Sequence, residues 1–331
     1  MRALQHKKLL SRLVKKSQRT TNLSLREFSD KRNSILIYRA NGGLGDILVH
    51  RMIFEDFKRI MPDAKIVFAC PGIYHQAIKG HPFVDELVDS GKIDQGDYLT
   101  SYNTTNACCR YEVRMAPLSG KNRSDIWANH CGVALENHNM HFQFSEQELI
   151  EAKREIESHR TQSGPTVLFS PISAMATKNL ISHQMEGVVN GLRERGCYVF
   201  YTHTGPIPML EHLKVPLLMG SIRKWMSFVA SADYIVSVDT ATFHMAGGLG
   251  KPQVGIFTMV DGKVYGRWYE NWTLVQKHRD DGNWNCGPCY NWPDCPKSKA
   301  YPKPCLTELT ADMILLGVDK MLKQPLKIIG G

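Results

Sequence analysis

The stretch VSVDTATFHMAGGLGKPQVGIF, Val236 to Phe257, decides the predicted fold. Ile235 to Val238 form a mostly β-branched run, and Pro252 to Phe257 form a second apolar run after a Gly-Lys-Pro break. Helix-forming residues lie between the two runs, so the order predicts a β-turn-α-β unit. Asp239 and Thr240 fall where the first strand ends and the helix begins, beside unpaired backbone N–H groups. A helix start of this kind favours the binding of a phosphate or diphosphate.

A second strand-to-helix turn is predicted near the beginning of the chain. The run SILIY, Ser34 to Tyr38, predicts a buried strand, and a loop with three glycines follows it before a helix expected to begin at Ile47. Glycines allow a tight turn and the close approach of a ligand to the backbone. Their spacing is neither that of a dinucleotide-binding loop nor that of a P-loop, which disfavours dinucleotide binding and ATP hydrolysis. From the residues alone, Asp46 either caps this helix or supplies a carboxylate to a site.

Strand and helix patterns alternate through the rest of the chain, which predicts an α/β fold. Residues 162–165, Gln-Ser-Gly-Pro, predict a linker between two domains. The expected division is a basic extension at 1–33, a first domain at 34–162 and a second domain at 165–331 that ends in a cysteine-rich loop and a closing helix. Residues 96–120 are polar and are expected to form an irregular loop.

The composition of the chain limits the classes of protein to which it can belong. The chain has 331 residues, of which 43% are apolar and 22% charged, which is ordinary for a globular protein. No apolar run reaches the roughly 20 residues that span a bilayer, and the N-terminus lacks a secretory signal, so a cytoplasmic protein is expected. The nine cysteines are an odd number and two of them, Cys70 and Cys197, lie in predicted buried strands, which favours a reducing compartment.

The net charge of +9 is concentrated at the N-terminus. Residues 1–33 hold ten Lys or Arg and two acidic residues, which leaves the remainder of the chain close to neutral. Residues 3–16 have the periodicity of a basic amphipathic helix. Such a helix binds an anionic membrane surface, which would place the protein peripherally at the inner membrane, or binds nucleic acid phosphates. The alternative is that its apolar stripe packs on the protein body.

The segment from Asp239 to Phe257 resembles the C-terminal signature of glycosyltransferase family 9, the bacterial heptosyltransferases. The residues that match in type and spacing are Asp239, Thr240, His244, Gly250, Lys251 and Pro252. Ala241 departs from the signature because it stands where the family usually has glycine. The resemblance implies a GT-B fold, in which two Rossmann-like α/β domains face a cleft.

The same resemblance implies roles for particular residues. Gly45 and Asp46 match the family's Gly-Asp pair, whose aspartate is expected to act as the general base, in a backbone loop with Gly42 and Gly43. Lys178 stands where a lysine contacts the donor's phosphates, although Asn179 and Leu180 replace the usual Trp-Pro after it. The full expected donor and phosphate set is Lys178, Asp239, Thr240, Ala241 and His244, with Asp239 orienting the turn or binding the ribose.

The implied function is an inverting, metal-independent glycosyl transfer. A heptose-like sugar would move from a nucleoside-diphosphate sugar to a hydroxyl of a lipopolysaccharide-type saccharide, with no cofactor required. Two alternatives remain open at the level of sequence. One is transfer to hydroxylated bases of DNA, which the basic N-terminal extension motivates. The other is a GT-B-like binding protein without catalytic activity.

Four cysteines cluster in one loop near the C-terminus. Cys286, Cys289, Cys295 and Cys305 follow the spacing C-x2-C-x5-C-x9-C. Four thiols can hold a tetrahedral Zn²⁺, and the C-x2-C pair is a good chelate, although the second pair is wider than in common zinc ribbons. The two interpretations are a structural zinc site and free or redox-active thiols, and a catalytic metal is disfavoured.

Overall fold

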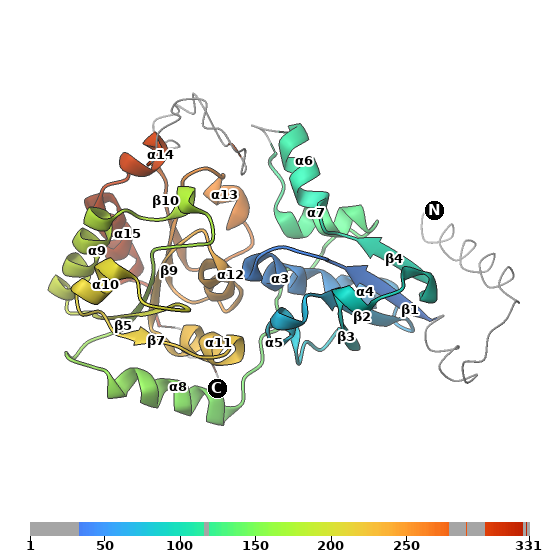
Figure 1. The fold of residues 1–331 in the computed structure, drawn as a ribbon, viewed down its shortest axis with the longest axis horizontal. Helices are drawn as coiled ribbons and strands as arrows, with labels where there is room; N and C mark the ends of the chain where they lie inside the picture. The colour runs from blue at the N-terminus through green and yellow to red at the C-terminus, as the bar shows by residue number, and fades with distance from the viewer. Residues whose placement is uncertain (1–32, 116–118, 278–288, 290–301, 327–328, 330–331) are drawn as a thin grey trace, which may run out of the picture.

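Two parallel β-sheets with flanking helices form the protein (Figure 1). The computed structural model describes residues 33–115, 119–277, 289, 302–326 and 329. The first sheet has the strand order β3-β2-β1-β4 and the second the order β10-β9-β8-β5-β6-β7. The strands of the first sheet are β1 (Ser34–Tyr38), β2 (Lys65–Cys70), β3 (Glu86–Asp89) and β4 (Thr100–Asn103). Those of the second are β5 (Thr166–Ser170), β6 (Tyr198–Thr202), β7 (Leu217–Leu218), β8 (Tyr234–Val238), β9 (Gln253–Ile256) and β10 (Trp272–Val275).

The helices divide into two groups joined by one connecting helix. The first group is α3 (Leu44–His50), α4 (Phe54–Ile60), α5 (His75–Ile78), α6 (Ala107–Met115) and α7 (Arg123–His130). The second is α9 (Ser182–Glu194), α10 (Pro208–His212), α11 (Ile222–Ser231), α12 (Ala241–Gly248), α13 (Gly262–Tyr265), α14 (Pro304–Thr307) and α15 (Ala311–Met321). The connecting helix α8 (Glu146–Ser158) begins at a capping box made by Ser145 and Glu148. We call β1–β4 with the first group the N-terminal unit, and β5–β10 with the second group the C-terminal unit.

The central strands are apolar because helices cover both faces of each sheet. All five residues of β8 are buried, and so are four of the five in β1. Ile35 of β1 pairs in parallel with Ile66 of β2 on one side and with Thr100 of β4 on the other. Val236 of β8 lies between Phe169 of β5 and Val254 of β9.

Each sheet contains two neighbouring strands from which the chain continues toward opposite edges of the sheet. In the N-terminal unit these strands are β1 and β4, and in the C-terminal unit they are β5 and β8. Parallel sheets bind ligands in the crevice at the carboxyl ends of such neighbouring strands. The loops that follow β1, β4, β5 and β8 are therefore the loops in which a site is expected.

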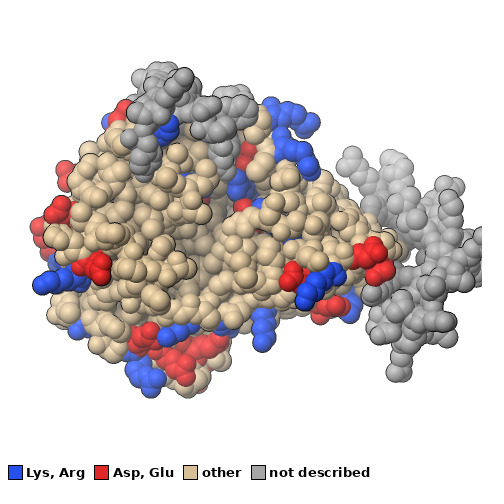
Figure 2. Space-filling view, viewed as in Figure 1, with Lys and Arg blue, Asp and Glu red and all other residues tan. Residues whose placement is uncertain are grey.

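The two units share an apolar core. One cluster of buried side chains contains Phe57 and Phe68 from the N-terminal unit together with Phe228 and Met245 from the C-terminal unit. Figure 1 shows α3 and α12 side by side where the units meet, and the space-filling view is hollowed between the units (Figure 2). Burial of apolar area across this junction favours the arrangement in which the two sets of loops face one another.

Three expectations from the sequence need correction or lie outside the described residues. Residues 96–120 are not an irregular loop, because β4 pairs with β1 and α6 packs against α7 within this range. Helix α3 begins at Leu44 instead of Ile47, since the N–H of Ile47 already donates to the carbonyl of Gly43. The basic extension falls outside the described residues except for Asn33.

Among the described residues, the helices are all too short or too polar to cross a membrane.

Candidate active site

The carboxylate of Asp46 is held between two arginines of the N-terminal unit. Arg39 follows β1, and its Nη2 donates to Asp46 Oδ2 at 2.7 Å. Arg123 begins α7, and its Nη1 donates to Asp46 Oδ1 at 2.8 Å. Asp46 lies in the first turn of α3 but is not its cap, because Gly43 occupies the cap position. The interpretation of Asp46 as a helix cap is therefore wrong.

The three predicted loop glycines have different surroundings. Gly42 has φ of +127°, and a Cβ there would lie 2.4 Å from Arg39 Nη2, so the arginine folds back over this glycine. A Cβ on Gly45 would lie 3.2 Å from His244 Cδ2 and 3.5 Å from the backbone nitrogen of Ala241. No atom lies within 4 Å of a Cβ built on Gly43. A side chain at Gly43 would therefore meet open space.

The charges around Asp46 keep it ionised. Burial alone would raise its pKa, but Arg123 and then Arg39 outweigh burial and lower the pKa to about 2. His50, one turn further along α3, is fully buried, and burial together with Arg39 lowers its pKa to about 3. At neutral pH, Asp46 is consequently a carboxylate and His50 a neutral imidazole.

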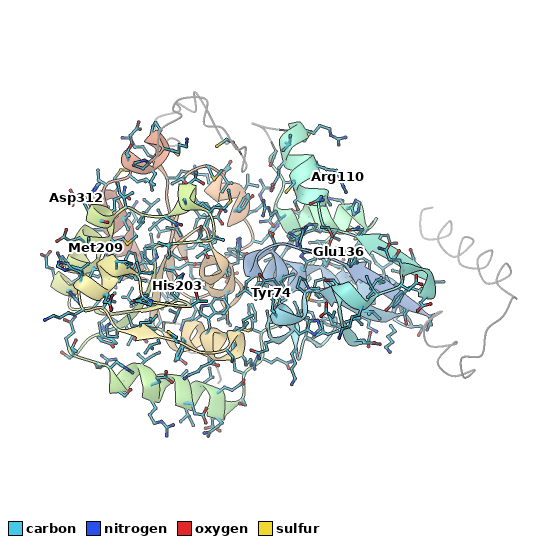
Figure 3. All side chains as sticks on the ribbon, viewed as in Figure 1. Tyr74, Arg110, Glu136, His203, Met209 and Asp312 are labelled. Carbon is cyan, nitrogen blue, oxygen red and sulfur yellow. The ribbon has the colours of Figure 1, made fainter. Side chains whose placement is uncertain are left out.

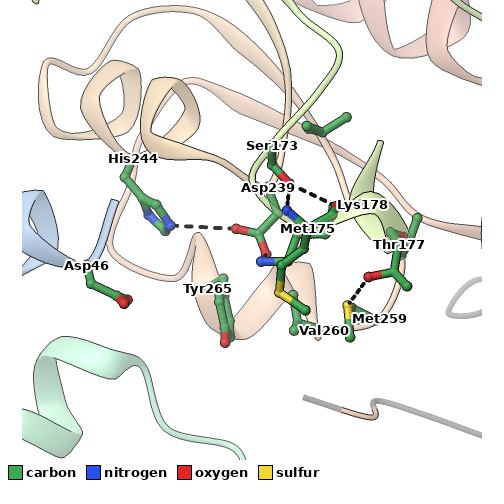
Figure 4. Close-up of polar contacts among 12 residues, drawn as sticks. Asp46, Ser173, Met175, Thr177, Lys178, Asp239, His244, Met259, Val260 and Tyr265 are labelled. Atoms are coloured by element: carbon green, nitrogen blue, oxygen red, sulfur yellow. Dashed lines mark hydrogen bonds and ion pairs between the residues drawn. The ribbon is translucent and has the colours of Figure 1, made fainter. Parts of the chain in front are cut away.

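A second cluster lies at the carboxyl ends of β5 and β8 in the C-terminal unit (Figure 4). Lys178 Nζ lies 2.7 Å from Asp239 Oδ2, and His244 Nε2 lies 3.7 Å from Asp239 Oδ1. Tyr269 OH is 2.8 Å from His244 Nδ1 and fixes the imidazole ring. Burial would raise the pKa of Asp239, but Lys178, with a smaller effect of His244, holds it well below its usual range.

The backbone start of α12 lies against the N-terminal unit. Thr240 is the cap residue of α12 in an extended conformation, and its hydroxyl makes no capping hydrogen bond. Ala241 is the first helical residue and is the one whose backbone approaches Gly45. His244 is one turn further on and is 8% exposed, so its ring is fixed inside the junction.

Tyr265 of α13 joins the two clusters. In Figure 4 it lies between Asp46 on one side and Asp239 with Lys178 on the other. Its hydroxyl donates to Glu112 Oε1 at 3.1 Å, and the guanidinium of Arg123 lies 5.1 Å from the centre of its ring. Burial raises the pKa of Tyr265 well above its usual value, which keeps the hydroxyl protonated as a donor.

The structure therefore brings the predicted residues together in two groups across one junction. Asp46, Gly42, Gly43 and Gly45 come from the N-terminal unit, and Lys178, Asp239, Thr240, Ala241 and His244 come from the C-terminal unit. Reasoning from the sequence missed five residues that contact them or one another, namely Arg39, Glu112, Arg123, Tyr265 and Tyr269. Arg39 carried a local signal, because it directly follows a predicted strand and precedes the glycine loop.

The cysteine cluster is only partly described. Cys286 and Cys295 lie outside the described residues, whereas Cys289 donates from its thiol to the carbonyl of Met259 at 3.6 Å. Among the residues that the structure describes, no three His, Cys, Asp or Glu side chains are arranged to hold a metal ion.

Two parallel α/β units whose strand ends and helix starts face one another define a GT-B-like fold. Residues 121–289, just over half of the chain, match glycosyltransferase family 9 (heptosyltransferase). The chain belongs to this family and is a glycosyltransferase. Comparison with the curated proteins finds no match.

Solved structures with a similar fold include three bacterial proteins. A family 9 glycosyltransferase from Veillonella parvula is 13% identical with a TM-score of 0.65, and the match covers 88% of this chain and 98% of that one. ADP-heptose lipopolysaccharide heptosyltransferase II of E. coli is 13% identical with a TM-score of 0.62, covering 87% and 98%. The iron-containing dodecameric heptosyltransferase TibC of enterotoxigenic E. coli, in complex with ADP-D-β-D-heptose, is 13% identical with a TM-score of 0.62, covering 89% and 77%. At these identities the likeness shows the fold alone.

Proposed function

We propose that this glycosyltransferase moves a heptose-like sugar from a nucleoside-diphosphate sugar to a hydroxyl of a lipopolysaccharide-type saccharide, with inversion at the anomeric carbon. The observation that supports it best is the position of the ionised Asp46 across one junction from the Lys178–Asp239–His244 cluster. Solved structures with a similar fold also include enzymes described with ADP-heptose, namely heptosyltransferase II and TibC.

Asp46 is proposed to act as the general base. The acceptor hydroxyl attacks the anomeric carbon, a C–O bond forms, the bond to the diphosphate breaks, and the hydroxyl proton passes to the carboxylate. With a pKa of about 2, Asp46 is fully ionised but weakly basic. Proton transfer is therefore expected late, when the forming bond has made the hydroxyl strongly acidic.

The C-terminal unit is proposed to stabilise the leaving diphosphate. Lys178 has three N–H donors, and its ion pair with Asp239 leaves others for phosphate oxygens. The backbone N–H groups at the start of α12, by Thr240 and Ala241, favour negative charge at the same place. These groups can stabilise the leaving group without a divalent ion, and His244 would contribute a hydrogen bond from its position one turn further on.

The test is a mass-spectrometric transfer assay with the wild type and with Asp46→Asn. We expect Asp46→Asn to lower the transfer rate by about 10²–10⁴-fold, because the amide cannot accept the proton. Lys178→Gln should also lower the rate, since it removes a positive charge from the leaving group. Donors are a panel of nucleoside-diphosphate sugars, and acceptors are truncated lipopolysaccharide and hydroxymethylated DNA.

Matched controls are Asp312→Asn and Lys153→Gln, which change exposed side chains of α15 and α8. Asp312 lies on the outer side of the C-terminal unit (Figure 3). Equal product from wild type and Asp46→Asn would refute the base assignment. Transfer to hydroxymethylated DNA alone would refute the saccharide as the acceptor. A wild-type enzyme that is inactive with every combination of donor and acceptor would refute the proposed substrates.

Two further parts of the chain carry proposals of the same kind. We propose that residues 1–33 bring the enzyme to an anionic membrane surface, with nucleic acid as the alternative partner, because they carry most of its net positive charge. We also propose that Cys286, Cys289, Cys295 and Cys305 hold a structural metal. TibC is described as containing iron, so elemental analysis of the full chain should measure iron as well as zinc.

A further inference from the structure

Arg123 lies between two carboxylates. Its Nε and Nη2 donate to the two oxygens of Glu112 at 2.8 and 2.9 Å, and its Nη1 donates to Asp46 at 2.8 Å. Glu112 lies on the inner face of α6 and is 1% exposed. A bidentate pair of this kind fixes the plane of the guanidinium and hence the direction of the N–H that points at Asp46.

The C-terminal unit completes this group of charges. Tyr265 donates from its hydroxyl to Glu112 Oε1, the same oxygen that accepts from Arg123 Nε, and its ring lies beside the guanidinium. Asn122, next to Arg123 in sequence, donates from Nδ2 to the carbonyls of Val264 and Tyr265 at 3.0 and 2.9 Å. The position of α13 is thus coupled to that of Arg123 through two separate contacts.

The carboxylate of Glu112 pairs with the same guanidinium that contacts Asp46, so its negative charge opposes part of the positive charge of Arg123. The charged or titratable groups that influence Asp46 are Arg39, Arg123 and the neutral His50, with Glu112, Cys108 and Tyr265 in the same cluster. Two arginines are balanced by two carboxylates. Without the charge of Glu112, Arg123 would hold Asp46 more strongly and a proton would be accepted less readily.

We propose that Glu112 and Tyr265 are positioning residues for the transfer reaction. Glu112 fixes the orientation of Arg123, and the positive charge of Arg123 is shared between Glu112 and Asp46. The hydroxyl of Tyr265 makes this arrangement depend on contact between the two units. The inference rests on the proposed role of Asp46 as the general base. Through these contacts, α6 and α13 keep Asp46 able to accept the proton only when the C-terminal unit, which is proposed to bind the donor, is in place.

The test compares kcat and KM for wild type, Glu112→Gln, Glu112→Asp and Tyr265→Phe. We expect Glu112→Gln to lower kcat by about 10–100-fold while the donor KM stays within about twofold, because only proton transfer is weakened. Glu112→Asp should restore part of the rate, since the carboxylate is kept. Tyr265→Phe keeps the ring and should lower kcat by several-fold. The double variant Glu112→Gln/Tyr265→Phe should equal Glu112→Gln alone, because the hydroxyl acts through Glu112.

Controls are Glu186→Gln on an exposed face of α9 and Tyr198→Phe in β6, which should keep the wild-type kcat. An unchanged kcat in Glu112→Gln, an effect on KM alone, or additive losses in the double variant would each overturn the inference. If Glu112→Gln does not fold, the kcat of Tyr265→Phe alone tests the inference. An unchanged kcat in Tyr265→Phe would then overturn the inference. Wild-type transfer with unaffected variants refutes the inference alone, whereas absence of wild-type transfer refutes the proposed function and the inference with it.

Discussion

Gly42 is the residue whose conformation the Asp46 site depends on most directly. Its φ of +127° is unfavourable for a residue with a side chain, and a Cβ would collide with the guanidinium of Arg39. We expect Gly42→Ala to lower the free energy of unfolding by about 1–3 kcal/mol and to displace Arg39 from Asp46. Urea unfolding and the transfer assay check the two effects.

The neighbouring glycine provides the control for this prediction. Gly43 has an extended backbone with φ of −81° and open space where a Cβ would stand. Gly43→Ala should change the free energy of unfolding by no more than about 0.5 kcal/mol. Equal losses at the two positions would mean that the left-handed conformation of Gly42 is not the cause.

The lowered pKa of the buried His50 predicts how the stability of the protein changes with pH. Its Nδ1 lies 2.7 Å from the carbonyl of Asp46, so Nδ1 carries the proton, and its Nε2 lies 3.0 Å from the hydroxyl of Thr104. Burial, followed by Arg39, lowers its pKa to about 3, below the value of about 6.5 in the unfolded chain. Between these values the unfolded state binds a proton that the folded state does not, so stability is lost as the pH falls below about 6.5.

We expect His50→Gln to remove that part of the pH dependence. Between pH 6 and pH 4 the free energy of unfolding should fall less steeply in the variant, by about 1.4 kcal/mol per pH unit. Urea unfolding at several pH values measures the slope. The control His203→Gln changes an exposed side chain (Figure 3) and should keep the wild-type slope. Identical slopes in His50→Gln and wild type would contradict the assignment.

At the scale of elements, the strands that carry the site and the helices that directly follow β1 and β8 could be predicted, whereas β4 and α6 could not. β1, β5 and β8 are short apolar runs that end in polar loops, so their ends and the residues after them, such as Asp239, were predictable. Residues 100–115 were not, because β4 is half-exposed and polar and α6 has the composition of a surface helix. Pairing with β1 and burial of Glu112 determine their structure, and both are contacts with residues distant in the sequence.

Contacts between residues that are distant in the sequence also explain which individual residues of the candidate site were missed. Asp46 and Lys178 were predicted as site residues because each follows a strand in a pattern that the family shares. Glu112, Arg123 and Tyr265 form their ion pairs and hydrogen bonds with residues 11 to 153 positions away, a separation that periodicity and spacing do not reveal. The predicted boundary at 162–165 lies between α8 and β5 and remains a prediction.

At the scale of the whole molecule, the site exists only while the two units stay together, and Asn122 is one of the residues that join them. Its Oδ1 accepts from the backbone N–H of Ser124 at the start of α7, while its Nδ2 donates to the two carbonyls of α13. Asn122→Asp keeps the first contact but turns a buried oxygen toward two carbonyl oxygens. The repulsion and lost hydrogen bonds should separate the units.

We expect Asn122→Asp to raise the radius of gyration in small-angle X-ray scattering and to raise the donor KM several-fold. Asn129→Asp introduces the same charge at an exposed position of α7 and should leave both quantities unchanged. Asn122→Ser should show a smaller effect, because serine still caps α7 but cannot reach both carbonyls. If Asn122→Asp has the scattering and the KM of the wild type, the shared apolar core, with Phe228 and Met245 among its residues, holds the units together without this contact.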